Sequence, residues 1–549
     1  MTTTLREATV ALSDGAHRPW ARTAALLRLY LRLDRVRIAV WALAVYGTVA
    51  GSIATLLETY PTQDSLQARA ALLSNPSAVM MTRPAFGREH YTFGAMVANE
   101  LSLWVLVAAA IMSVLLVVRH TRAEEEAGRL EVVRALPVGR FAPPTAAFAT
   151  VAVANVVVGA AVTAGLLSGG ADLAVADSAA FGVGTALTGL VFAAVAAVAA
   201  QLTEHGRAAS GAALAVVGAT FLTRGIGDVI DPLGSPLSWT SPFAWAQQTR
   251  LYVDLRWWPL VLSAVAAAAL GALAVGLAQR RDLGAGLRAP RPGPAGAAPA
   301  LLGPVGLAWR LLRGLFWGWA AGTTLFAVAF GAMANSLEDF AEELPDLGDL
   351  FQIDLTDLTN AFASVVLAFL VVGVACFVVA AVLRLRAEEG QGRVAAVVVT
   401  GTSRPRLLAG WLAVVAGGAV VMTVLVGLGA GVGVWSGSGD PAWVGRMAVA
   451  ALAYLPAVAL FGAVAVALAG LAPGAAPWAW LPVGWSAFVL FLGGLLDLPE
   501  WTREVSPFEH TPLVPQEALA AGPLVVMGLT AAALVAAGFV GFTRRDLER

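Results

Sequence analysis

The side chains that could do chemistry in this chain gather in a charged signature that occurs twice. Residues 122–129 read Arg-Ala-Glu-Glu-Glu-Ala-Gly-Arg, and residues 386–393 read Arg-Ala-Glu-Glu-Gly-Gln-Gly-Arg. Carboxylates and guanidinium groups form ion pairs and charge-assisted hydrogen bonds. Their repetition favours a charged surface that binds a partner. The alternative is that these charges only anchor a helix end at a membrane interface.

Catalytic and metal-binding groups do not converge in the sequence. An enzyme embedded in a membrane would need His, Asp, Glu, Cys or Ser groups at one depth, and no such set can be assembled. His120 and His205 stand without companion ligands, so we expect no metal site. All 35 basic residues are arginine, whereas the nucleotide-binding loop GxxxxGK[ST] requires a lysine. We therefore expect no such ATPase site in this chain.

The composition indicates a protein embedded in lipid. Hydrophobic residues make up 58% of the 549 residues, charged residues make up 13%, and the mean hydropathy is +0.76. A soluble core could not bury this much apolar surface, whereas a bilayer can. The net charge of −1 gives no indication of a nucleic-acid partner. We expect an all-α polytopic protein of the cell membrane.

Further strings repeat in the same register as the signature and indicate an internal duplication. Arg-Arg-Asp-Leu at 280–283 recurs at 544–547, and Ser-Pro-Phe at 241–243 recurs at 506–508. We predict a first six-helix repeat over 1–283, a Pro- and Gly-rich linker over 284–305 and a second repeat over 306–549. Twelve apolar stretches could cross about 30 Å of hydrocarbon: 38–57, 94–118, 142–166, 180–202, 209–225, 257–279, 316–335, 360–383, 406–433, 445–471, 476–496 and 521–542.

An even number of spans places both repeats the same way up in the membrane. Arginine-rich segments such as 119–140 and 384–406 then lie inside, with both termini, and the acidic connection 336–358 lies outside. Basic amphipathic segments at 20–37 and 306–316 predict elbow helices on the membrane surface. Six arginines on the expected outer side run against this charge rule: Arg69, Arg83, Arg88, Arg224, Arg250 and Arg256.

The signature is expected to form a short helix in each repeat, over 120–136 and over 385–400. Acid-first pairs four residues apart, such as Glu125 with Arg129, support an exposed helix. Its apolar side would carry Leu130, Val133 and Leu136. The charged side would remain solvated, with Glu124, Glu125, Arg129 and Arg134.

This arrangement resembles the permease subunit of an ABC-type exporter of the type-2 class. It is most similar to the fused, double-length permeases of actinobacterial exporters of polyketide antibiotics. The resemblance covers nearly the whole chain through the RxEExxGR repeats, the Ser-Pro-Phe segments and the terminal Arg-Arg-Asp-Leu.

The resemblance implies that each signature is a coupling helix that docks into a separate ATPase. Two copies of that ATPase would bind ATP and Mg and drive the export of hydrophobic antibiotic-, drug- or lipid-like molecules. This chain would bind no cofactor. The coupling role would fall on Arg122, Glu124, Glu125, Gly128 and Arg129, and on Arg386, Glu388, Glu389, Gly392 and Arg393.

Residues of the transport pathway are less well defined by the sequence. Glu100 lies within an apolar stretch, where a carboxylate is costly and faces the bundle or a water-filled cavity. A structural hydrogen bond is the alternative. Trp104, Phe221 and Phe330 could line a hydrophobic path, or they could serve ordinary packing.

Two other classes of protein remain open. An ion-coupled secondary drug transporter of the major-facilitator type also has two parallel six-span halves and needs no ATPase. Its loop between spans two and three is short and basic, whereas a mixed-charge segment of about 17 residues occupies that place here. A membrane enzyme or a scaffold protein is the third reading.

Overall fold

The computed structural model describes residues 19–546 except 72, 74–78, 81, 83, 85, 283, 288–292, 294, 334–354 and 493–498. Within that part the chain is helical and contains no strand. It divides into two compact units, Met1–Pro292 and Gly293–Arg549. The division falls inside the Pro- and Gly-rich segment 284–305.

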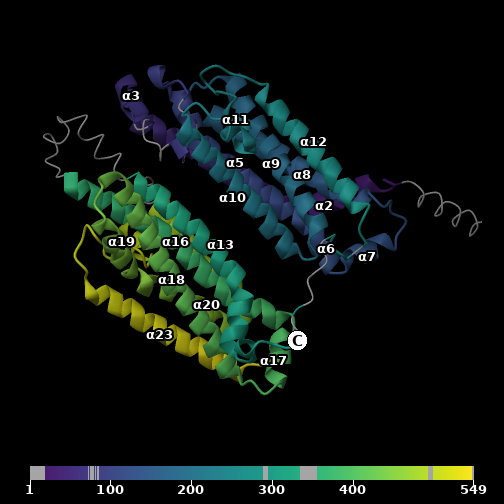
Figure 1. The fold of residues 1–549 in the computed structure, drawn as a ribbon, viewed down its shortest axis with the longest axis vertical. Helices are drawn as coiled ribbons and strands as arrows, with labels where there is room; N and C mark the ends of the chain where they lie inside the picture. The colour runs from purple at the N-terminus through teal and green to yellow at the C-terminus, as the bar shows by residue number, and fades with distance from the viewer. Residues whose placement is uncertain are drawn as a thin grey trace, which may run out of the picture. The chain divides into compact units, whose positions relative to one another are not determined.

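The first unit is a bundle of six long helices (Figure 1). They are α2 Thr23–Thr59, α5 Phe93–His120, α8 Ala142–Ser168, α9 Val175–Leu202, α10 Gly206–Ile230 and α12 Pro259–Ala278. Short elements join them: α3 Gln63–Ala71, η2 Arg88–His90, α6 Arg122–Glu126, α7 Arg129–Arg134, η3 Ser238–Thr240 and α11 Pro242–Gln247. Figure 1 shows α6 and α7 at one end of this bundle and α3 at the other.

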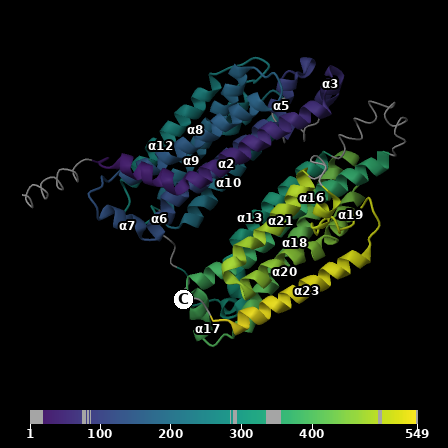
Figure 2. The same ribbon diagram turned by 180° about the vertical axis from the view of Figure 1, so that it is seen from behind.

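The second unit repeats this plan (Figure 2). Its longer helices are α13 Pro304–Ala332, α16 Leu355–Gly390, α18 Arg404–Ser438, α19 Ala442–Leu452, α20 Leu455–Leu471, α21 Trp480–Leu492 and α23 Ala521–Arg544. The shorter ones are η4 Pro299–Leu302, α17 Arg393–Val399, η5 Pro473–Ala479 and α22 Glu500–Glu504. The second unit carries α17 at one end of its bundle.

Eleven helices in the described part of the chain are long and apolar enough to cross a membrane. The prediction of an all-α polytopic membrane protein is confirmed. The predicted span 476–496 falls on η5 and α21, and its last four residues lie outside the described residues. A proline-rich entry, with Pro473 and Pro477, gives η5 its tighter 3-10 winding before α21 begins.

The predicted elbows are continuous with the spans that follow them. Residues 23–37 form the beginning of α2, and residues 306–316 form the beginning of α13. For α2 we attribute this to the absence of Gly and Pro within 24–46. The acidic connection lies mostly outside the described residues, at 336–354.

Glycines allow consecutive spans to pack backbone against backbone. A Cβ atom at Gly159 of α8 would lie 2.5 Å from the carbonyl oxygen of Gly182 of α9. The second unit uses the same device, since a Cβ at Gly427 of α18 would lie 2.5 Å from Met447 O of α19. Small residues of this kind permit close helix association where lipid provides no hydrophobic drive.

We predict that Gly182→Ala lowers the free energy of unfolding by about 1–3 kcal/mol, because its methyl group would overlap the backbone of Gly159. Thermal unfolding in detergent measures this change. The matched control is Gly184→Ala on the same helix, whose Cβ would make ordinary 3.5 Å contacts with Ala246 and Leu260. Equal unfolding midpoints for the two variants would contradict the prediction.

Candidate functional site

Each signature forms a sharp turn between two helices. In the first unit α6 ends at Glu126 and α7 begins at Arg129, with Gly128 between them at φ 70°. In the second unit α16 runs to Gly390 and α17 begins at Arg393, with Gly392 at φ 73°. The left-handed backbone suits glycine, which lacks a Cβ. We call residues 122–136 and 386–399 the corners of the two units.

An ion pair closes each corner across its glycine. Arg129 donates from Nε and Nη2 to the two oxygens of Glu124 at 2.7 and 2.8 Å. In the second unit Arg393 donates from Nε to Oε2 of Glu388. Hydrogen bonding to the carboxylate raises the pKa of Arg129. The expected pairing of Glu125 with Arg129 four residues later is therefore wrong, because the left-handed glycine ends the helix between them.

A buried cluster holds the remaining charges of the first signature. The Glu125 carboxylate accepts from Arg281 Nη2 and Nη1 at 2.5 and 3.0 Å, and from Arg122 Nη1 at 2.5 Å. Arg122 also donates to the carbonyl oxygens of Ala200 and Ala285. The Glu125 side chain is 7% exposed, so the expectation that it stays solvated is wrong. We call this cluster the clamp of the first unit.

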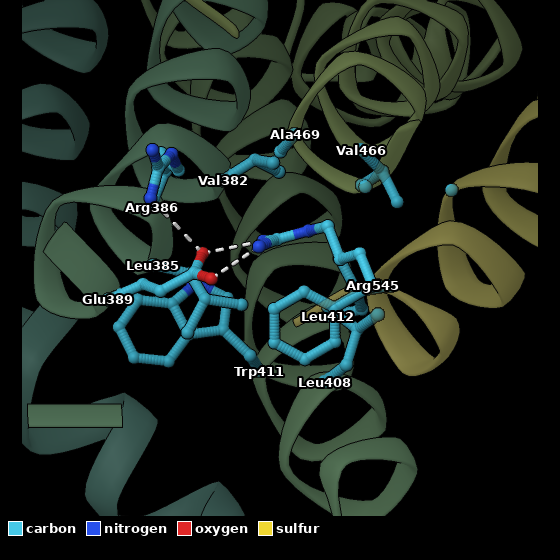
Figure 3. A pocket seen from close by; sticks show the side chains of 13 residues that line it. Val382, Leu385, Arg386, Glu389, Leu408, Trp411, Leu412, Val466, Ala469 and Arg545 are labelled. Atoms are coloured by element: carbon cyan, nitrogen blue, oxygen red, sulfur yellow. Dashed lines mark hydrogen bonds and ion pairs between the residues drawn. The ribbon is translucent and has the colours of Figure 1, made fainter. Parts of the chain in front are cut away.

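The second unit builds the same clamp around Glu389, whose side chain is 2% exposed. Arg545 donates from both terminal nitrogens to the two carboxylate oxygens at 2.5 and 2.6 Å, and Arg386 lies 3.4 Å away. Figure 3 shows the guanidinium fork of Arg545 facing the Glu389 carboxylate beside Trp411. A cavity of about 20 Å³ adjoins the clamp, which is room for one water molecule.

Sequence reasoning missed Arg281 and Arg545 as members of the site. Both belong to the repeated Arg-Arg-Asp-Leu string, and each follows Glu125 or Glu389 by 156 residues. That shared spacing was the available signal. Two strings that keep one register through a duplication can meet in space, even when far apart in the chain.

Each corner exposes apolar side chains beside charged ones such as Arg129 and Arg393. Val132 is 69% exposed and Val399 is 87% exposed, and Leu136 is exposed as well. On the other side of the same short helices, Leu130 and Val394 are buried in their units. The ion pairs of the signature thus fix the conformation of the corner, and valine and leucine side chains are exposed on it.

The predicted pathway residues have ordinary partners or exposed positions. Glu100 forms an ion pair with Arg69, which is the structural alternative raised for it. Phe221 is buried under the guanidinium of Arg224, and Phe330 stacks on Phe326 at 6.2 Å. Trp104 is exposed on α5. In the residues described, no group of three or more His, Cys, Asp or Glu could hold a metal.

A buried polar network in the first unit was not foreseen. Arg224 lies on α10, within the predicted apolar stretch 209–225, and its side chain is fully buried. Its Nη1 donates to Thr82 O at 2.9 Å and to Gln247 Oε1 at 3.1 Å, and lies 3.4 Å from Asp228. Asp228 in turn accepts from Ser238 Oγ at 2.6 Å. A charge in a span is tolerated when it is paired in this way.

The Ser-Pro-Phe segments also lie deeper than a surface turn. Ser241 and Ser506 each accept a hydrogen bond from the backbone nitrogen two residues later, at 3.3 Å. The buried rings that follow pack on the fourth span: Phe243 lies 5.0 Å from Phe192, and Phe508 lies 5.2 Å from Phe461.

Comparison with known proteins gives two matches that agree with the duplication. A family model described as the C-terminal domain of the multidrug efflux system permease Rv1217c matches residues 24–281 and 301–543. One stretch lies in each unit. The multidrug efflux system permease protein Rv1217c of Mycobacterium tuberculosis is 39% identical over 539 residues, which cover 96% of this chain and 95% of that protein.

We predict that Gly392→Ala lowers the free energy of unfolding by about 1 kcal/mol, because a Cβ is disfavoured at this positive φ. Hydrogen–deuterium exchange over 393–399 should also become faster. Gly390→Ala is the matched control, since Gly390 ends a helix and has open space at its Cβ. A loss at Gly390 equal to that at Gly392 would refute the assigned role of the left-handed glycine.

Proposed function

This chain belongs to the family of multidrug efflux system permeases represented by Rv1217c, and we propose that it is the membrane subunit of an ATP-driven exporter. Its cargo would be hydrophobic small molecules of antibiotic-, drug- or lipid-like character. The relative's name supports efflux of several drugs. The ATP-driven mechanism rests on this chain's own features.

The duplicated corner is the observation that carries the proposal. A permease without a lysine-bearing nucleotide loop needs an external source of work. Two corners of the same geometry, one in each unit, suit two copies of one ATPase. ATP and Mg would bind to those copies, and this chain would contribute the two-state element that they drive.

The structure revises which residues would contact the ATPase. Of the ten signature residues assigned to coupling, the two inner glutamates are enclosed by arginines, and the glycines turn the chain. We propose that the exposed apolar side chains Val132, Leu136 and Val399 contact the partner instead, since contact would remove them from water. The signature would then hold those side chains at a defined angle.

We place both corners and both termini on the cytoplasmic side. The arginine-rich segments on either side of the corners support this orientation.

An ion-coupled transporter is the second candidate, and one observation favours it. The buried Arg224–Asp228 pair is the kind of embedded charge on which ion coupling can depend. In the second unit, however, the positions 264 residues later are Phe488 and Leu492. The corner occurs in both units and the charge pair in one, so we favour the ATP-driven mechanism.

We predict that Val132→Asp combined with Val399→Asp reduces the amount of co-purified ATPase at least about tenfold, because two carboxylates would enter an apolar contact. The partner to test would be an ATP-binding-cassette protein encoded beside this chain. Reconstituted wild-type complex should move a fluorescent hydrophobic dye with ATP and not with a proton gradient alone.

The matched control is Leu302→Asp, an exposed leucine of the linker region outside the corners. Size-exclusion profiles should be the same for all three proteins. Undiminished ATPase capture by the double variant, or dye transport on a proton gradient without ATP, would reject the proposal.

A further inference from the structure

We infer that Arg281 and Arg545 are positioning residues that join each corner rigidly to the sixth span of its unit. This inference rests on the proposed function, and it adds the route by which work entering at a corner reaches the bundle. The sixth spans are α12 and α23, and the two arginines follow the last residues of these helices. Nothing in the local sequence of the corners requires such a connection.

The geometry of the contact is that of a rigid joint. A guanidinium fork meets both oxygens of one carboxylate, so the two groups cannot rotate about a single hydrogen bond. The arginine side chains are only 10% and 16% exposed, and the glutamates are less exposed still. An exposed ion pair between flexible side chains contributes little and changes its geometry easily. A buried contact through two hydrogen bonds keeps the relative orientation of the two side chains.

A second arginine ties the same carboxylate to the corner's own helix. Arg122 and Arg386 lie three residues before Glu125 and Glu389 and pair with them. Each glutamate therefore has one partner on the corner and one at the end of the sixth span. Displacement of the corner must carry the span end with it, or else leave a buried carboxylate without a partner.

The joint reaches further spans in both units. In the first unit Arg281 Nε donates to Gln201 Oε1 at 2.5 Å, at the end of α9. In the second unit Arg404 Nη1, at the start of α18, donates to Arg545 O at 2.6 Å. Within α23, before Arg545, the helix packs on α20 through glycine, since a Cβ at Gly538 would lie 2.5 Å from Val466 O.

These contacts separate a mechanical joint from simple anchoring of a helix end. An anchoring arginine extends its side chain to water or lipid headgroups. Arg280 and Arg544, the neighbours of the joint residues in the same motif, are exposed in that manner. One arginine of each pair faces outward, and the next is enclosed against a carboxylate from the corner.

The exposed neighbours supply a matched control for the experiment. In the purified permease alone, Arg281→Gln with Arg545→Gln should accelerate hydrogen–deuterium exchange in both corners about tenfold. Arg280→Gln with Arg544→Gln should leave that exchange unchanged. Equal exchange in the two variants would overturn the inference without involving any ATPase. Arg281→Lys with Arg545→Lys keeps both charges and should give an intermediate rate.

The assembled complex gives the second readout. The Gln variants at 281 and 545 should retain ATPase capture within about twofold and lose dye transport per ATP about tenfold. Full transport in these variants would overturn the inference. Failure of wild-type permease to capture an ATPase, with the exchange difference present, would instead reject the proposed function and leave the joint standing.

A covalent replacement of the joint tests rigidity directly. Glu125→Cys and Arg281→Cys can be combined with Cys376→Ser, because Cys376 is the one native cysteine. A short bifunctional thiol reagent should then restore the transport that the two cysteine substitutions remove. If the two ends moved apart during the cycle, the cross-link would block transport, and the inference would fail.

Discussion

The pairing of two buried glutamates with arginines from distant parts of the chain is the interaction on which the rest of the structure depends. The side chains of Glu125 and Glu389 are almost fully buried, at 7% and 2% exposed. A carboxylate in that position must be matched by charge and hydrogen bonds. The arginines that match it come from the corner and from the end of the sixth span, so corner and bundle are held in one arrangement.

The sequence predicted the general architecture well, because the relevant signals are local and repeated. Apolar length identified the spans, and the common register of three strings identified the duplication. The contacts within the signature were harder. Helical periodicity predicted that Glu125 pairs with Arg129 on the same helix face. It carries no information about a left-handed glycine at 128 or about a partner 156 residues away.

The two units have kept the clamp and diverged elsewhere. The first unit encloses a polar network around Arg224 and Asp228, at positions where the sequence of the second unit has Phe488 and Leu492. Its corner carries three consecutive glutamates, whereas the other corner has glycine in place of the third glutamate. Similar corners would then transmit similar motions to two bundles whose side chains differ.

The exposed apolar side chains of the corners also affect the permease before it has a partner. Val132, Leu136 and Val399 project outward at the ends of well-packed bundles. Exposed apolar side chains of this kind favour self-association and recognition by chaperones and proteases. If the proposed ATPase covers these side chains, a permease synthesised in excess over it would be the shorter-lived subunit. Balanced production of the two proteins would then be enforced by degradation of the uncovered one, without a dedicated regulator.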